Sequence, residues 1–147
     1  MQDPTVLGYL GRALSLELSA VQQYLALAKL LDLRGMSKAG EKFRHEAQEE
    51  MEHAERIIGR MLALGAAPNA SHLRPCRLDG ALPQLLKHAA DLEQEIIGFY
   101  AQAVRYCSQS QDHENRLFFE TLLAEEQHHG AEIDAWRQAI VAAQPTA

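Results

Sequence analysis

The five prolines of this 147-residue chain lie near its two ends or between residues 68 and 83, and long uninterrupted segments separate them. These segments are rich in Ala, Leu, Glu and Gln, and their apolar residues recur at steps of three and four. That period places apolar side chains on one face of an α-helix, whereas a half-buried strand needs a period of two. The pattern therefore predicts an all-α protein built from long helices.

Residues that favour helix ends divide the chain into four such helices. Asp3 stands before Pro4, a pair typical of a helix start, because the carboxylate accepts from free backbone amides and proline fits the first turn. Ser37, Asp79 and Asp112 are the caps expected for the other three helices. We predict helices at residues 4–34, 38–64, 80–108 and 113–143.

Residues 66–78 form one long irregular connection, because this segment is polar and interrupted by Pro68 and Pro75. Four helices joined by short, long and short connections predict a bundle with a crossover between the second and third helices. That is the connectivity of ferritin-like folds. An apolar content of 47% can supply one core of this size, so we expect a single domain over residues 1–147.

Charge and cysteine content exclude several classes of function. A formal net charge of −6 disfavours nucleic-acid and anionic-membrane partners, because both require a basic surface. The chain does not open with a basic stretch before an apolar run, and no apolar segment reaches the roughly 20 residues of a membrane span. We expect a soluble cytoplasmic protein.

Cys76 and Cys107 lack the paired spacing of a zinc or rubredoxin site and are expected to be reduced structural thiols.

Two of the predicted helices contain a Glu-x-x-His motif, in which both side chains share one helix face. Glu50 and His53 form it in the second helix, and Glu125 and His128 form it in the fourth. The spacing alone is weak, because these residue types are common on solvated helices.

A leading glutamate on the preceding helix strengthens each motif. Glu17 lies 33 residues before Glu50. Glu93 lies 32 residues before Glu125, so the two halves of the chain repeat one plan. A tyrosine also follows each leading glutamate by seven residues. These are Tyr24 and Tyr100.

The leading glutamates stand among apolar residues and are expected to face the core. Buried carboxylates cost several kcal/mol each unless they are paired, and four of them would also repel one another. Two Fe(II) ions would balance four carboxylates, and oxygen and imidazole ligands suit iron or manganese. The sequence therefore predicts a dinuclear metal centre. The alternative is a polar stripe on each helix of a metal-free helical interaction protein.

Residues from about Gly8 to Trp136 resemble the bacterioferritin family. The resemblance is carried by residues 17–24, Glu-Leu-Ser-Ala-Val-Gln-Gln-Tyr, and by residues 45–56, His-Glu-Ala-Gln-Glu-Glu-Met-Glu-His-Ala-Glu-Arg. It implies that Tyr24 orients a ligand carboxylate, whereas Tyr100 has no counterpart in the family. It also implies six metal ligands: the terminal carboxylates Glu17 and Glu93, the bridging carboxylates Glu50 and Glu125, and the imidazoles His53 and His128.

The resemblance further implies a ferroxidase that holds two iron ions per subunit and oxidises Fe(II) with O2 or H2O2, for iron storage and detoxification. It implies haem b between two subunits, with Met51 of each subunit as an axial ligand. Met51 follows Glu50 by one residue, so it is turned about 100° around the helix and can point outward, away from the metal ligands. His45 and Glu49 match an iron site on the inner surface of the family's shell. A diiron oxidase or peroxidase that does not store iron is the main alternative.

Other histidines are expected at the surface. His129 adjoins His128 but turns to another face, and its Glu-x-x-His with Glu126 lies out of register with the repeat. Surface roles are also expected for His72, His88 and His113.

The family's fifth helix, which packs about the fourfold axis of a 24-subunit shell, has no matching segment after residue 142. We expect that helix to be absent, which leaves both a closed cage and a twofold homodimer open. A ferredoxin or a second bacterioferritin-type subunit as partner is also left open.

Overall fold

The computed structural model describes residues 3–70 and 72–143, and this part of the chain contains four α-helices and no strand. The all-α prediction is therefore confirmed. The prediction about a fifth helix concerns the last residues of the chain, and positions 144–147 lie outside the described part. The helices are α1 (Pro4–Leu33), α2 (Ser37–Ala63), α3 (Leu82–Gln109) and α4 (His113–Ala143).

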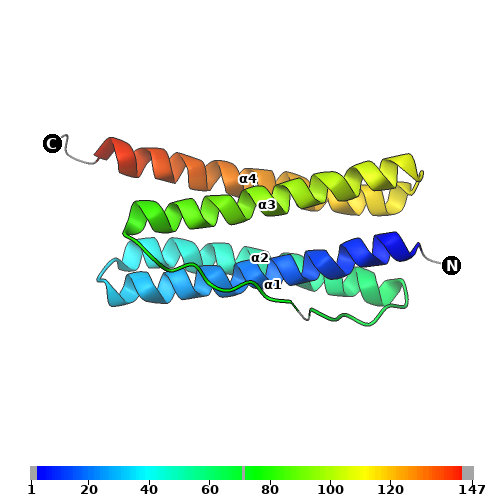
Figure 1. Cartoon of the computed structure of the whole chain (residues 1–147), viewed down its shortest axis with the longest axis horizontal. Coiled ribbons are helices and arrows are strands. Elements are labelled where there is room, and N and C mark those ends of the chain that lie inside the picture. The colour runs from blue at the N-terminus through cyan, green and yellow to red at the C-terminus, as the bar shows by residue number, and fades with distance from the viewer. Residues whose placement is uncertain (1–2, 71, 144–147) are drawn as a thin grey trace.

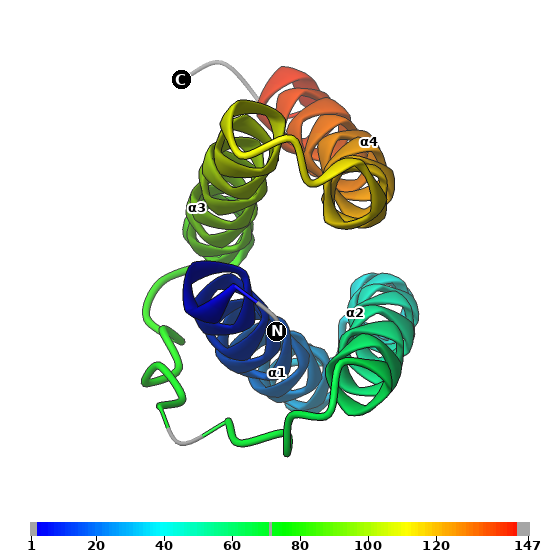
Figure 2. The same cartoon turned by 90° about the vertical axis from the view of Figure 1, so that its right-hand side faces the viewer.

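The four helices form a bundle in which α1 packs against α2 and α3 against α4 (Figure 1). Viewed from the end, α1 also lies beside α3, while α2 and α4 face each other across the bundle (Figure 2). The segment between α2 and α3 runs along the length of the bundle outside α1 and α3, as predicted for a crossover.

The crossover is tied to α1 by two polar side chains. The Gln23 amide donates to the backbone oxygen of Arg77 at 2.8 Å and accepts from the Arg77 amide at 2.8 Å. The Ser19 hydroxyl accepts from the Arg74 amide at 3.0 Å. These bonds satisfy backbone groups of a segment that has no ladder or helix to satisfy them.

The helix starts are partly as predicted. The Asp3 carboxylate accepts from the Thr5 amide at 2.8 Å, and the Asp112 carboxylate accepts from the Asn115 amide at 3.2 Å. The predicted caps Ser37 and Asp79 are wrong. Ser37 is already the first helical residue of α2, after Met36, and α3 begins only at Leu82.

The core combines helix-facing aliphatic and aromatic side chains from all four helices. Its largest fully buried members are Tyr24, Tyr100, Phe43, Phe119, Leu10, Leu14, Leu27, Leu31, Ile57, Leu85, Leu86 and Ile96. Within the described residues, no helix combines the length and the apolar character that a membrane crossing requires.

Candidate metal centre

Six acidic and imidazole side chains meet in the middle of the bundle, and none is more than 5% exposed. All four helices contribute, α1 and α3 with one glutamate each, and α2 and α4 with a glutamate and a histidine each. The six are Glu17, Glu93, Glu50, His53, Glu126 and His129.

These side chains form two groups that share two glutamates. Glu17 and His53 belong to one group, Glu93 and His129 belong to the other, and both groups contain the glutamates of α2 and α4. Within each group, one potential ligand atom from every residue lies within 4.8 Å of the others. The shared residues are Glu50 and Glu126.

Both histidines direct Nδ1 into the cluster. His53 Nδ1 lies 2.7 Å from Glu126 Oε1 and 3.4 Å from Glu17 Oε2. His129 Nδ1 lies 2.9 Å from Glu50 Oε1. Each histidine therefore reaches a shared glutamate from the opposite helix, and the two rings stack with centroids 5.6 Å apart.

The prediction that Glu125 and His128 face the core is wrong by one residue. The Glu125 side chain is 44% exposed and forms an ion pair with Arg56. The His128 side chain is 72% exposed and lies 2.8 Å from Glu132. The expectation of a surface role for His129 is wrong for the same reason.

The phase of α4 explains the error. Its buried residues recur at alternating steps of four and three, the spacing that keeps side chains on one helix face. They include Asn115, Phe119, Leu122, Glu126, His129 and Ile133.

A constant offset between the halves of the chain would have given the same answer. Glu93 lies 76 positions after Glu17 (93 − 17), and Tyr100 lies 76 positions after Tyr24 (100 − 24). Adding this offset to the first Glu-x-x-His motif gives Glu126 and His129.

Two buried tyrosines bind the outer carboxylates. The Tyr24 hydroxyl donates to Glu93 Oε1 at 2.5 Å, and the Tyr100 hydroxyl donates to Glu17 Oε1 at 2.7 Å. Burial, together with the neighbouring carboxylates, raises the pKa of both tyrosines well above the usual value. Both hydroxyls therefore keep their protons and act as donors.

The carboxylates of the cluster are held in a low-dielectric environment. Burial first, and neighbouring carboxylates second, raise the pKa of Glu50 and Glu93 well above the usual value. Burial lowers the pKa of His53, but its hydrogen bonds to Glu126 and Glu17 outweigh burial and raise it to about 10. Protons thus supply positive charge to the metal-free cluster.

The donor set fits a pair of divalent metal ions. Each of the four carboxylates keeps one buried oxygen without a hydrogen-bond partner, an arrangement that is costly unless a cation is bound. A cleft of about 360 Å³ reaches both histidines from the surface between α2 and α4. Its lining includes Glu49, Glu52, Glu125 and His128.

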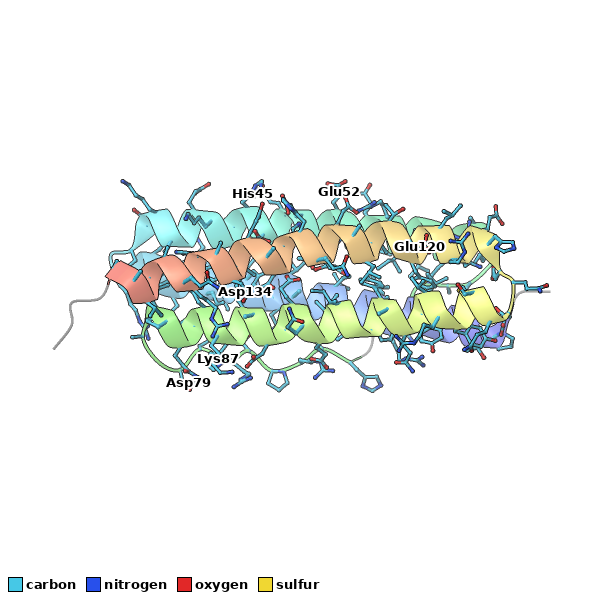
Figure 3. All side chains as sticks on the ribbon, turned by 90° about the horizontal axis from the view of Figure 1, so that it is seen from above. His45, Glu52, Asp79, Lys87, Glu120 and Asp134 are labelled. Atoms are coloured by element: carbon cyan, nitrogen blue, oxygen red, sulfur yellow. The ribbon has the colours of Figure 1, made fainter. Side chains whose placement is uncertain are left out.

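Residues expected to bind other groups lie on the periphery of the cluster. Met51 is 48% exposed. His45 projects away from the bundle (Figure 3), and its Nε2 lies 2.8 Å from Glu49. Glu49 also contacts His129 Nε2, and together with Glu46 these two form a third group of potential ligands.

The remaining histidines and cysteines are mostly as expected. His72 and His113 are exposed, whereas the surface role expected for His88 is wrong, because His88 is 3% exposed and lies 3.0 Å from Asp79. Cys76 and Cys107 are both free thiols.

Comparison with known proteins agrees with the fold. The ferritin-like domain family matches residues 7–141. Bacterioferritin from Rhodobacter capsulatus is 34% identical over 127 residues, which cover 86% of this chain and 79% of that protein. Bacterioferritin from Streptomyces coelicolor is 32% identical, with 86% and 76% covered. Bacterial ferritin from Synechocystis sp. is 34% identical, with 85% and 81% covered.

A solved structure of Rhodobacter capsulatus bacterioferritin superimposes with a TM-score of 0.93 at 30% identity, covering 98% of this chain and 90% of that one. That structure has a metal-free dinuclear site and a haem iron in a crystallographic special position. The chain belongs to the bacterioferritin family of ferritin-like proteins.

Proposed function

We propose that this protein is a ferroxidase that oxidises Fe(II) with O2 or H2O2 at a dinuclear centre in the middle of the bundle. The observation that carries the proposal is the pair of buried ligand groups that share Glu50 and Glu126. Family membership supports it, because bacterioferritins from three organisms match most of the chain.

Each residue of the cluster has a distinct part in this proposal. Glu17 and His53 would hold one metal ion, and Glu93 and His129 would hold the other. Glu50 and Glu126 belong to both groups and would therefore serve both metal ions. Two bound iron ions would supply one electron each to the oxidant. The chain would set the number and spacing of the ligands, and the cleft between α2 and α4 would give the oxidant access to both histidines.

The residues also manage protons at the centre. The cluster holds protons on carboxylates whose pKa is raised, so metal binding must release them. The imidazoles bind metal only in their neutral form, which adds a further proton for His53.

The test compares two double variants that differ by one helix position. Anaerobic Fe(II) titration of the wild type should saturate at two ions per chain, and O2 should then produce ferric absorbance. Glu126→Ala with His129→Ala should abolish both, because the variant lacks one shared ligand and one imidazole. Glu125→Ala with His128→Ala should retain saturable binding at two ions.

The reverse pattern would show that the fourth helix presents its other face to the metals. Absence of saturable binding in the wild type would refute the ferroxidase.

Haem b binding between two subunits, with Met51 as axial ligand, is a second part of the proposal. The Met51 side chain is 48% exposed although the adjacent Glu50 is fully buried, so the thioether is available to a group outside the bundle. The haem of the related Rhodobacter structure supports this part.

Storage depends on assembly, and we propose a homo-oligomer with a 24-subunit shell as its storing form. His45 and Glu49 are proposed as an iron site on the inner surface of that shell. Sedimentation separates the shell from a dimer, and a dimer would leave oxidation without storage. Three expectations stay predictions. They are a cytoplasmic location, a single domain over residues 1–147, and a ferredoxin or a second subunit as partner.

A further inference from the structure

We propose that Tyr100 is a positioning residue for one metal position of the centre, the position of Glu17 and His53. Tyr24 serves the other position, that of Glu93 and His129. The inference rests on the proposed dinuclear centre and deepens it, because it assigns each tyrosine to one metal ion.

The two oxygens of Glu17 have different surroundings. The Tyr100 hydroxyl binds Oε1 at 2.7 Å. Oε2 is buried, has no hydrogen bond and lies 3.4 Å from His53 Nδ1. Tyr100 therefore occupies one oxygen and leaves the other free, next to the imidazole of the same metal group.

Glu93 is divided in the same way on the other side of the cluster. The Tyr24 hydroxyl binds its Oε1 at 2.5 Å, and its Oε2 is buried without a hydrogen bond. The two tyrosines thus perform equivalent contacts at the two halves of the centre.

The crossed pairing follows from the arrangement of α1 and α3. The two helices lie side by side and run in opposite directions (Figure 1). Each carries a glutamate and, seven residues or two helical turns later, a tyrosine. In antiparallel neighbours the glutamate of one helix then meets the tyrosine of the other, as both hydrogen bonds show.

Packing fixes the position of the Tyr100 hydroxyl. Tyr100 is fully buried, and its ring centroid lies 5.9 Å from that of Phe99 and 6.2 Å from that of Phe119. A hydroxyl on a fixed ring restricts the carboxylate rotation of Glu17 before a metal binds. Loss of such a contact to a metal ligand typically weakens metal affinity by 10–100-fold.

Co(II) is the probe, because its visible absorption reports coordination and O2 can be excluded from the titration. In the otherwise wild-type chain, Tyr100→Phe should weaken one of two Co(II) binding steps by about 10-fold or more and change the absorption spectrum. Phenylalanine keeps the buried ring and deletes only the hydroxyl, so the fold should be preserved.

Two single-site backgrounds identify the affected position. His129→Ala leaves the group of Glu17 and His53 with its imidazole, and there Tyr100→Phe should weaken Co(II) binding. In the His53→Ala background, Tyr100→Phe should have no effect on Co(II) binding. Tyr24→Phe should show the opposite dependence on background.

Tyr106→Phe is the matched control, because the Tyr106 hydroxyl donates to the carboxylate of Asp3, the residue that caps the start of α1, and not to the cluster. It should leave Co(II) binding unchanged. Equal weakening by Tyr100→Phe in both backgrounds, or none in either, would overturn the positioning role while two bound Co(II) ions in the wild type upheld the centre. A wild type that binds no Co(II) would overturn the centre and the inference together.

Discussion

Glu46 borders the metal cluster from α2 and is 7% exposed, with one oxygen that has no hydrogen-bond partner. Burial is the main cause that raises its pKa from 4.5 to about 7; the charge of His129 opposes this, and that of Glu49 adds to it. In the folded metal-free protein, Glu46 therefore holds its proton over a pH range where the unfolded chain has released it.

This difference predicts a pH-dependent stability. Between pH 4.5 and about 7 the folded state binds more protons than the unfolded state, so Glu46 lowers the free energy of unfolding as pH rises. Glu46→Gln should remove this loss and stabilise the metal-free protein at pH 8 by on the order of 1–2 kcal/mol, because the amide carries no charge but is also buried.

Urea unfolding of both proteins without metal, at pH 5 and at pH 8, measures the effect. The free energy of unfolding of the variant should exceed that of the wild type at pH 8 and differ little from it at pH 5. An equal gain at both values would assign the effect to packing rather than to ionisation.

Single residues also mark where sequence reasoning stopped. Glu17, Glu50, His53 and Glu93 reach the cluster as predicted, but the fourth helix presents Glu126 instead of its neighbour. Adjacent glutamates and adjacent histidines satisfy the same motif in two registers about 100° apart. Only the phase of the buried residues over several turns distinguishes the registers.

At the scale of the helices, the close approach of α1 and α2 depends on Gly40. A Cβ atom at this position would lie 2.9 Å from the backbone oxygen of Ala28. Gly40→Ala should therefore separate the two helices and lower the free energy of unfolding by about 1–3 kcal/mol.

Gly59, on the same helix, is the matched control. A Cβ atom there would meet nothing within 4 Å, so Gly59→Ala should stabilise the protein by about 0.5–1 kcal/mol through helix propensity. Chemical unfolding of the metal-free variants measures both. Stabilisation by Gly40→Ala would show that the helices adjust without cost.

Helix extents were predictable because period, prolines and glycines agree over long segments. Helix starts were less predictable, because a residue with a good capping side chain caps a helix only if that side chain does not bind another group. Asp79 lies 3.0 Å from the buried His88, which keeps it in the crossover three residues before α3. The ties from Ser19 and Gln23 to the crossover join residues more than 50 positions apart, and nothing local predicts them.

At the scale of the whole molecule, the two halves of the chain are related by the same offset of 76 positions that relates the cluster residues. Phe43 and Phe119 are both fully buried, and so are Glu50 and Glu126, each pair 76 positions apart (119 − 43 and 126 − 50). Two similar helix pairs facing each other explain why the centre has two equivalent halves. The crossover returns the chain to the other end of the bundle, so α3 runs opposite to α1 and the second pair is antiparallel to the first (Figure 1).

The proposed assembly would add a further pair of equivalent positions, and Met51 is where it can be tested. The proposed twofold contact would place the exposed Met51 side chains of two subunits on either side of one haem b. Met51→Leu should therefore abolish haem binding, because leucine has a similar volume but no thioether to bind iron. Oligomeric size and Co(II) binding should be unchanged, since Met51 lies outside both ligand groups.

Haem titration followed by absorption measures haem binding, and sedimentation measures oligomeric size. The wild type should saturate at one haem per two chains. Met36→Leu is the control, because Met36 is 36% exposed in the turn between α1 and α2 and should leave haem binding intact. Retained haem in Met51→Leu would place the axial ligand elsewhere. Loss of haem together with loss of the dimer would show that Met51 acts through subunit packing, because a ligand role alone leaves the protein contact in place.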